Sequence, residues 1–575
     1  MIKRLARSVR EYKWASIGSP LCMIGEVTME IFIPLVLAEL LRQGIEPGYM
    51  PAVWKYGGLL ALCALCSLLF GVASAFFAAY ASTGFARNLR HDMFAKVQTY
   101  DFSNIDKFST SSIVTRLTSD VATLQMTFQM SIRMIFRTPV MLVMALIMAF
   151  RISPKLSVIY CIVLPLLAVA LFTLIKMVHP LFQRVFKTYD KLNNVVQENV
   201  HGIRVVKSFV RQEKEIEKFA GTSETIYKDF VKAERIMAFN NPFMQLAIYT
   251  CIIVISFLGA KLVVSQELDT AALTAMFTYT SQILMGLMMM SMVFVMFTMS
   301  REPMRRAYEI LTEEPALANP ENPVKEVADG SIDFEDVNFR YAKTADRNTL
   351  DHIDLHIKAG QTVGILGGTG SSKSTLVQLI PRLYDVTEGT LKVGGVNVKD
   401  YDIHVLRDQV AMVLQKNVLF SGTIRDNLRW GNPNATDEEM EHACRLACAH
   451  DFITSFPDGY DSHIEQGGTN VSGGQKQRLC IARALLKKPK ILILDDSTSA
   501  VDTHTDAMIR KAFAEEIPGT TKLIIAQRVA SVQEADKIVV LDGGKIAAVG
   551  NHAELLNTSD IYREVYESQV KGGEE

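Results

Sequence analysis

Long runs without any charged residue fill the first part of this 575-residue chain, and they constrain its fold more than any other feature. No charge occurs between Gly57 and Arg87, a run well above the roughly 20 apolar residues that cross a bilayer as a helix. Such runs recur over the first ~300 residues, whereas the last ~250 have the composition of an ordinary soluble α/β domain. We therefore predict a membrane half followed by a soluble half.

Six membrane spans are expected in the first half, and an even number returns the chain to the side on which it starts. Their approximate ranges are 14–41, 57–86, a third ending at 150, 156–175, 237–260 and 270–300. The third is the least clear, because Arg133 and Arg137 leave it only a short apolar stretch. The fold predicted for this half is therefore all-α.

The connections between these spans differ in charge. Lys and Arg number four in the short connections 42–52, 151–155 and 261–269, and eighteen in the long segments 87–133 and 176–236. The positive-inside rule places the long segments, the N-terminus and the soluble half in the cytoplasm. We expect a multi-pass membrane protein, with spans that continue as helices into the cytosol and turns near 105–112 and 202–206 that could touch the soluble domain.

Two acidic residues and a methionine run are the candidates for a substrate cavity. Glu26 and Glu30 lie one helical turn apart in the first span, where an unpaired carboxylate is costly. They either form a patch that attracts cations in a translocation pathway or a hydrogen-bonded structural pair near the bilayer edge. The methionines around Met289 in the sixth span provide either an adaptable surface for an amphipathic substrate or plain packing and lipid contact.

A proline-containing segment separates the two halves. Pro315, Pro320 and Pro323 fall within 313–329, which we interpret as a linker between a membrane domain (1–312) and a soluble domain (330–575). The net charge of −1 argues against a general nucleic-acid binder.

The soluble half carries a glycine-rich loop between an apolar strand (363–366) and a segment that opens a helix at Leu376. This context is typical of a phosphate-binding loop, in which backbone N–H groups and the helix N-terminus face the phosphates. Lys373 would meet the β and γ phosphates, and the Ser374 hydroxyl would bind Mg²⁺. The loop residues are Gly367, Gly368, Thr369, Gly370, Ser371, Ser372, Lys373, Ser374 and Thr375. Ser372 stands where the strict pattern has its second glycine.

A second apolar strand, 491–494, ends in Asp495, a carboxylate that can hold Mg²⁺ through water. Its position downstream of the glycine-rich loop makes the pair far more specific than either motif alone. Together they predict an ATP site with Mg²⁺.

These motifs resemble those of the ATP-binding-cassette (ABC) family, most strongly over about residues 331–567. The layout of the whole chain resembles an ABC exporter half-transporter of the multidrug-resistance type. The resemblance implies six transmembrane helices with the type I exporter (type IV) fold, fused to an α/β P-loop nucleotide-binding domain.

The resemblance also assigns roles to single residues. Tyr341 matches the aromatic that stacks on adenine, and Gln415 the glutamine that senses Mg²⁺ and contacts the membrane-domain turns. The intact signature, which binds the γ-phosphate held by the opposing subunit, comprises Ser472, Gly473, Gly474 and Gln475. The loop that connects the two ATP sites matches Ser499, Ala500, Val501 and Asp502.

Three positions depart from the family pattern. Asp496 stands where the family has the glutamate that polarises the attacking water, and it is one methylene shorter. Gln527 replaces the switch histidine and cannot become cationic or shuttle a proton. With Ser372, these departures indicate a slow, degenerate ATP site.

We therefore predict the degenerate-site half of a heterodimeric ATP-driven exporter of amphipathic or drug-like substrates. Its partner would be a related half-transporter with the catalytic Glu and His, and lipid would surround it. A lipid or peptide exporter half and an ATP-gated channel or regulator are the alternatives. An importer subunit is disfavoured because membrane and nucleotide domains share one chain, and a soluble chromosome-associated ATPase because of the six spans.

Overall fold

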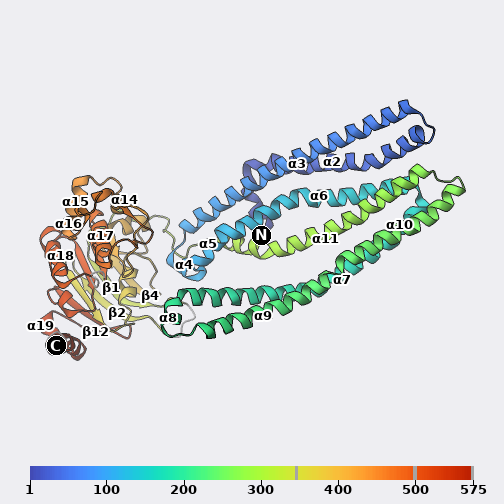
Figure 1. Cartoon of the computed structure of the whole chain (residues 1–575). Coiled ribbons are helices and arrows are strands. Elements are labelled where there is room, and N and C mark those ends of the chain that lie inside the picture. The colour runs from blue at the N-terminus through green and yellow to red at the C-terminus, as the bar shows by residue number, and fades with distance from the viewer. Residues whose placement is uncertain (343–346, 497–500, 572–575) are drawn as a thin grey trace. The chain divides into compact units, whose positions relative to one another are not determined.

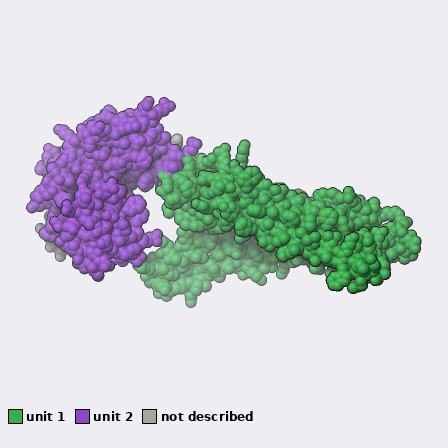
Figure 2. Space-filling view, turned by 90° about the horizontal axis from the view of Figure 1, so that it is seen from above, with its two compact units in different colours: residues 1–98, 110–313 green, residues 99–109, 314–575 purple. Residues whose placement is uncertain are grey.

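The computed structural model describes residues 1–342, 347–496 and 501–571. It forms two compact units (Figure 2). The first contains Met1–Gln98 and Thr110–Glu313, and the second contains Thr99–Ser109 together with the chain from Glu314 onward.

The first unit is built from long helices (Figure 1). The helices that include the apolar runs are α2 (Lys13–Leu40), α3 (Met50–Gln98), α6 (Val121–Ile152), α7 (Pro154–His201), α10 (Asn240–Val264) and α11 (Thr270–Thr312). The others are α1 (Ile2–Leu5), α5 (Thr110–Thr115), α8 (Ile203–Ser208) and α9 (Gln212–Met237), with short 3-10 or π turns at Ala6–Tyr12, Leu41–Ile45 and Arg116–Asp120. Within the described residues, six helical stretches are long and apolar enough to cross a membrane, so the expected number of spans is confirmed.

The spanning helices are much longer than a bilayer requires. Helix α3 has 49 residues and α7 has 48, which at 1.5 Å per residue is about 70 Å, against roughly 30 Å of hydrocarbon. The expected continuation of the helices beyond the apolar core is therefore present. Helix α3 ends before Thr99 and helix α7 ends before Gly202. Both ends lie close to the turns that the sequence predicts near 105–112 and 202–206.

Several helices of this unit share one apolar core. Val27 and Ile31 of α2 pack in the same cluster as Met141 of α6 and Tyr279 and Ile283 of α11. The Tyr279 hydroxyl donates to the Ile31 carbonyl over 2.7 Å, which satisfies a buried polar group inside that core. Helices α2, α6 and α11 are thus packed directly together.

The second unit contains two main sheets. An antiparallel sheet has the order β2-β1-β4-β5, and a mostly parallel sheet has the order β12-β11-β3-β10-β9-β6. Their strands are β1 (Ile332–Phe339), β2 (Leu350–Ile357), β3 (Thr362–Gly367), β4 (Glu388–Val393), β5 (Val396–Asn397), β6 (Val410–Val413), β9 (Ile491–Asp495), β10 (Thr521–Ile525), β11 (Lys537–Asp542) and β12 (Lys545–Gly550); a short pair is formed by β7 (Gly422–Thr423) and β8 (His463–Ile464).

The helices that follow β3 in this unit pack on the parallel sheet or on one another (Figure 1). They are α12 (Lys373–Leu379), α13 (Ile403–Gln409), α14 (Ile424–Arg429), α15 (Asp437–Leu446), α16 (His450–Thr454), α17 (Gly473–Leu486), α18 (Thr503–Glu516), α19 (His552–Thr558) and α20 (Asp560–Lys571). Strand β9 is buried at all five positions, as expected of a central parallel strand with both faces covered.

The segment Thr99–Ser109 packs within the second unit although the sequence places it in the membrane domain. It holds helix α4 (Phe102–Phe108), whose N-cap is Asp101. The second carboxylate oxygen of Asp101 accepts from the backbone N–H groups of Ala316 and Leu317, at 2.6 and 3.0 Å. Burial raises the pKa of Asp101, but the hydrogen bonds from Ser103, Asn104, Leu317 and Ala316 together outweigh it and hold the pKa below its usual value. The turn segment 99–109 is therefore fastened to the start of the linker.

Candidate nucleotide site

The motifs predicted to handle ATP meet at one edge of the parallel sheet. Strands β3, β10 and β9 are neighbours, with Ile525 aligned to both Ile365 and Asp495. Because parallel strands end at the same edge, the residues that follow them come together, the usual place for a ligand in such a sheet. The phosphate loop follows β3, and Gln527 lies just after β10. Asp495 is the last residue of β9, and Asp496 follows it.

The glycine-rich loop folds tightly after β3. A side chain at Gly367 would place its Cβ 2.2 Å from the Leu541 carbonyl oxygen, so only glycine fits there. Ser372 has φ 70° and ψ 23°, a left-handed conformation that glycine adopts without cost and serine does not. The substitution that the sequence marks as unusual therefore stands at a strained position.

The ammonium group of Lys373 lies inside the phosphate loop and contacts the backbone of that loop. Its Nζ donates to the carbonyl oxygens of Gly367 and Gly368, at 2.9 and 2.8 Å, and lies 3.3 Å from the Ser371 hydroxyl. Burial lowers the pKa of this lysine, while the charges of Asp496 and Asp495 act in the opposite direction. A phosphate group would replace these carbonyl contacts with stronger, charge-assisted ones.

The two residues expected at Mg²⁺ lie against each other. The Ser374 hydroxyl donates to Asp495 Oδ1 over 3.0 Å. A hydroxyl and a carboxylate oxygen are donors that Mg²⁺ accepts, with phosphate and water completing its coordination. The residues present therefore fit Mg²⁺ bound together with ATP.

Asp496 and Gln527, the two departures at the hydrolytic position, bond to each other. Gln527 Nε2 donates to Asp496 Oδ2 over 2.8 Å, and the Asp496 N–H donates to the Ile525 carbonyl over 3.0 Å. Asp496 has φ 49°, a conformation that aspartate tolerates better than most residues. The short carboxylate is thus held to strand β10 from both its backbone and its side chain.

The residue expected to stack on adenine lies in an aromatic cluster. Tyr341 is half exposed and its hydroxyl lies 3.0 Å from the hydroxyl of Thr375, in the helix that follows the phosphate loop. Its ring meets those of Phe339 and Tyr384 edge to face, with centroids 4.9 and 5.1 Å apart. One open ring beside the phosphate loop is available for a base.

Tyr384 is a residue of this region that motif reading missed. Its ring also lies 6.0 Å from Phe102, and its hydroxyl donates to Asp106 Oδ2 over 2.9 Å. Burial, followed by the Asp106 bond, raises the pKa of Tyr384. It therefore connects the adenine-side tyrosine to the turn segment 99–109. No sequence signal indicates a contact between residues so far apart in the chain.

The signature begins helix α17. The Ser472 hydroxyl accepts from the Gln475 N–H over 3.2 Å, and the Gln475 side chain accepts from the Ser472 N–H over 2.9 Å, a reciprocal cap. Gly473 and Gly474 follow without side chains, so an anion can approach this helix N-terminus closely. The structure describes no bond from these residues to the phosphate loop of the same chain.

Two further predicted residues lie at the surface. Gln415 is exposed just after β6. Asp502 caps helix α18 and accepts from the Thr505 N–H over 2.9 Å, a bond that lowers the pKa of Asp502. Ser499 and Ala500, which begin the predicted connecting loop, lie outside the described residues.

The acidic pair of the first span has a basic partner that the sequence reading did not assign. Arg137 bonds Glu26 over 2.5 Å and both carboxylate oxygens of Glu30 over 2.9 Å. The pair is thus partly neutralised, and Arg137, expected to weaken the third span, is an ion-pair partner inside the helix bundle. Met289 is half-buried on α11. Their part in a substrate cavity stays a prediction.

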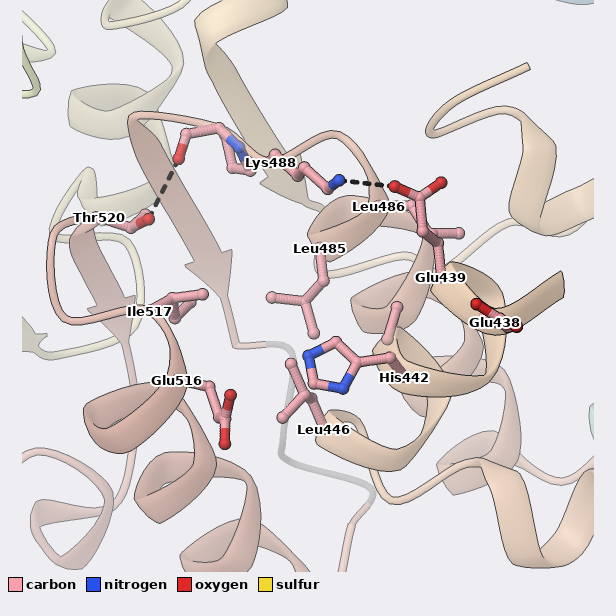
Figure 3. A pocket seen from close by; sticks show the side chains of 12 residues that line it. Glu438, Glu439, His442, Leu446, Leu485, Leu486, Lys488, Glu516, Ile517 and Thr520 are labelled. Carbon is pink, nitrogen blue, oxygen red and sulfur yellow. Dashed lines mark hydrogen bonds and ion pairs between the residues drawn. The ribbon is translucent and has the colours of Figure 1, made fainter. Parts of the chain in front are cut away.

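A separate pocket of about 430 Å³ opens between α15, the end of α17 and the end of α18 (Figure 3). His442, Leu446 and Leu485 form its interior, and Glu439 at its rim is paired with Lys488. None of the predicted ATP-binding residues lines it, so the nucleotide site is assigned from the sheet edge and its motifs, not from this cavity.

Comparisons with known proteins agree with this assignment. A family model described as the ABC transporter transmembrane region matches residues 17–288, and one described as ABC transporter matches 350–499. The chain is 35% identical over 547 residues to YfiB of Bacillus subtilis (strain 168), an uncharacterized ABC transporter ATP-binding protein, covering 95% of each chain. It is 33% identical over 576 residues to YknU of the same organism, covering 99% of this chain and 97% of YknU.

A solved structure shows the same fold. A bacterial Atm1-family ABC exporter with ATP bound superposes with a TM-score of 0.84 at 24% identity and covers 98% of both chains. The predicted fold class, six transmembrane helices fused to a P-loop nucleotide-binding domain, is confirmed.

Proposed function

The chain belongs to the ABC transporter family, and from this premise we propose that it is the degenerate-site half of a heterodimeric exporter. The observation that carries the proposal is the 2.8 Å hydrogen bond between Gln527 and Asp496. Two of the three departures from the family pattern, Asp496 and Gln527, occupy one hydrolytic position and bond each other, while the other nucleotide-binding motifs are present apart from Ser372 in the phosphate loop.

The chemistry of this pair supports slow turnover. Asp496 directly follows Asp495, and its side chain is one methylene shorter than the glutamate that the family places there. Gln527 offers an amide N–H to that carboxylate but no proton that it can release at neutral pH. A misplaced general base forfeits much of the roughly 10²–10⁴-fold that proton transfer contributes.

Nucleotide binding itself needs none of the missing groups. Lys373 exchanges its loop carbonyls for phosphate oxygens, Ser374 and Asp495 hold Mg²⁺ with the nucleotide, and Tyr341 offers its ring to the base. The site is therefore suited to retain ATP. Retained ATP would bias two nucleotide domains toward contact, as any ligand biases the state that it binds better.

The signature supports a division of labour between subunits. In this family one subunit's phosphate loop faces the other subunit's signature, so the capped, glycine-containing start of α17 would complete a site on the partner. We expect that partner to be a related half-transporter with the catalytic Glu and His. Its competent site would then reset the transport cycle.

The proposed cargo is an amphipathic or drug-like molecule that leaves the cytoplasm, with Glu26, Glu30 and Met289 at its path. The proposed location is the bacterial cytoplasmic membrane, with the N-terminus and the nucleotide-binding domain inside. The charge difference between short and long connections supports this orientation.

Purification of the tagged chain from its native membrane tests the pairing. We expect a second half-transporter to co-purify, with Glu and His at the positions of Asp496 and Gln527. The chain alone, reconstituted in nanodiscs, should hydrolyse ATP at least about 100-fold more slowly than the pair. Rapid ATP hydrolysis and transport by the chain alone would contradict the proposal.

A further inference from the structure

The backbone that follows strand β10 is held by a side chain of helix α20. Gln569 Nε2 donates to the Gln527 carbonyl over 2.8 Å, and Gln569 Oε1 accepts from the Val529 N–H, also over 2.8 Å. Both ends of one amide are used, which fixes the orientation of the Gln569 side chain. The first of these bonds holds the backbone of the residue whose side chain bonds Asp496.

This stretch of backbone lies outside regular structure. Strand β10 ends at Ile525. The next element is a 3-10 turn, Val529–Ser531, so Gln527 and Arg528 belong to neither. A strand or a helix would pair and fix such backbone groups by itself. Here Gln569 accepts from one backbone N–H and donates to one carbonyl, as a neighbouring strand would, so the position of Gln527 depends on another element.

The sequence of α20 explains why Gln569 reaches this backbone. Tyr562, Tyr566 and Gln569 are spaced by four and then three residues, so they lie on one face of the helix. Tyr562 is 1% exposed in the same core cluster as Val529, and Tyr566 packs against that cluster. The Tyr562 hydroxyl lies 2.6 Å from His552 Nδ1 on the preceding helix. The apolar face therefore anchors α20, and Gln569 continues this face by one turn.

A second side-chain bond holds the end of the same segment. The Ser531 hydroxyl donates to Asp506 Oδ2 of α18 over 3.2 Å. This bond acts at the end of the 3-10 turn, four residues beyond Gln527. The bond from Gln569 acts on the carbonyl of Gln527 itself, and it is therefore the contact that bears most directly on the hydrolytic position.

A fixed carbonyl restricts the side chain of its own residue. Because the peptide group is planar, a bond to the Gln527 carbonyl also fixes the plane that leads into Arg528. Loss of that bond would return conformational freedom to the backbone and spread the positions that the Gln527 side chain occupies. ATP differs from ADP in the γ-phosphate, the group that is attacked at the hydrolytic position. Misplacement of Gln527 should therefore affect the binding of ATP and not that of ADP.

We propose that Gln569 is a positioning residue for the hydrolytic position. It holds the backbone on both sides of Arg528 and so directs the Gln527 side chain to Asp496 and, when ATP is bound, to its γ-phosphate. The inference rests on the proposed function for the role of Asp496 and Gln527. It makes α20 a part of the ATP site, although Gln569 lies 42 positions beyond Gln527 in the chain.

Nucleotide affinity of the full chain in nanodiscs tests the proposal, with fluorescent analogues of ATP and ADP in the presence of Mg²⁺. Gln569→Leu removes both bonds and nearly keeps the size of the side chain. We expect it to weaken ATP binding about three- to tenfold, the range for one lost hydrogen bond, and to leave ADP binding unchanged. Because Gln569 is exposed, its replacement leaves no buried cavity and the variant should fold.

A second variant isolates the bond to Gln527. Gln569→Glu keeps an acceptor for the Val529 N–H but cannot donate to the Gln527 carbonyl, so it should lose as much ATP affinity as Gln569→Leu. Ser568→Ala is the matched control, because the Ser568 hydroxyl donates to the Val565 carbonyl within α20. It should bind both nucleotides like the wild type. Amide hydrogen exchange over 526–532 should speed up in Gln569→Leu and stay unchanged in Ser568→Ala.

A double variant separates positioning from a general loosening of the domain. Since Gln569 acts through Gln527, Gln569→Leu should cause no further loss of ATP affinity in a Gln527→Ala background. Equal ATP affinities of wild type and Gln569→Leu, an equal loss of ATP and ADP binding, or full additivity of the two substitutions would overturn the proposal. The proposed function is tested by turnover and by co-purification of a partner, which these measurements do not use, so either proposal can fail alone.

Discussion

Gln527 Nε2 donates a 2.8 Å hydrogen bond to Asp496 Oδ2 across the ends of two adjacent parallel strands. The amide fixes the direction in which the carboxylate points. The two positions therefore act as one unit. If only one of the two positions is restored to the family residue, Glu or His, the other still carries a side chain that suits the Asp496–Gln527 pair.

The first prediction concerns this coupling. Asp496→Glu alone should raise the ATPase rate of the purified chain by less than about threefold, and Gln527→His alone by a similar factor. The double variant should exceed the product of the two single effects, because residues in contact are not additive. Steady-state phosphate release in nanodiscs measures all four proteins. A large gain from Asp496→Glu alone would show that the two positions are independent.

The second prediction concerns backbone strain in the phosphate loop. Ser372 is left-handed, with φ 70°, and glycine at this position relieves about 1 kcal/mol. Ser372→Gly should raise the unfolding midpoint of the nucleotide-binding domain by roughly 2–4 °C and tighten ATP binding. Scanning fluorimetry with and without Mg-ATP measures both effects.

Ser371→Gly is the matched control for that variant. Ser371 has an ordinary φ, and its hydroxyl lies near Lys373 Nζ, so glycine there should give no gain. Equal stabilisation by both substitutions would mean that strain at Ser372 is not the cause.

The nucleotide site could be predicted from the sequence because its parts are contiguous motifs. Lys373, Ser374 and Asp495 each follow a recognisable apolar strand, and parallel strands bring such residues to one edge. The Gln527–Asp496 bond could be predicted only if it were also known that β10 lies next to β9. Strand order is a tertiary property that no local pattern contains.

In the membrane half, the contacts between helices could not be predicted from the sequence. Six apolar runs predict six helices, but not how each helix is rotated against its neighbours. In the sequence Arg137 only shortens the apolar stretch of the third span, because its partners, Glu26 and Glu30, lie 111 and 107 positions away. Such pairings depend on packing, and no spacing within one helix indicates them.

The third prediction concerns pH. Burial raises the pKa of Asp495, and the charge of Asp496 adds to that rise, while the Ser374 hydroxyl opposes it. A raised folded-state pKa means that ionised Asp495 costs stability at neutral pH, a cost that disappears as pH falls through that pKa. Mg²⁺ needs the ionised form, so Mg-dependent ATP affinity should fall on acidification before an ordinary aspartate would titrate.

Binding of a fluorescent ATP analogue between about pH 8 and pH 5, with Mg²⁺ or with EDTA, measures this dependence. Asp496→Asn removes the neighbouring charge and should move the loss of Mg-dependent affinity to lower pH. The EDTA series serves as the reference, because it reports nucleotide binding without the metal. An unchanged profile in Asp496→Asn would exclude the carboxylate pair as the source.

The fourth prediction concerns Tyr384, whose hydroxyl joins the adenine-side aromatic cluster to Asp106 in the turn segment 99–109. Tyr384→Phe keeps the ring contacts with Tyr341 and Phe102 but removes the bond to the carboxylate. A hydrogen bond to a charged group is worth about 1.5–3 kcal/mol, and exposure of Asp106 places the expected loss at the lower end. Amide hydrogen exchange in 99–109 should therefore speed up about tenfold, with ATP affinity unchanged.

Tyr341→Phe separates the two functions of this cluster. It removes the hydroxyl that faces Thr375 but leaves the Tyr384–Asp106 bond in place, so exchange in 99–109 should stay at the wild-type rate. Its ring can still stack on a base, so ATP affinity should change little. If Tyr384→Phe and Tyr341→Phe loosened the turn segment equally, the Asp106 bond would not be what fastens it. A selective effect of Tyr384→Phe would instead identify its hydroxyl as a polar link between the nucleotide-binding domain and the turn segment 99–109.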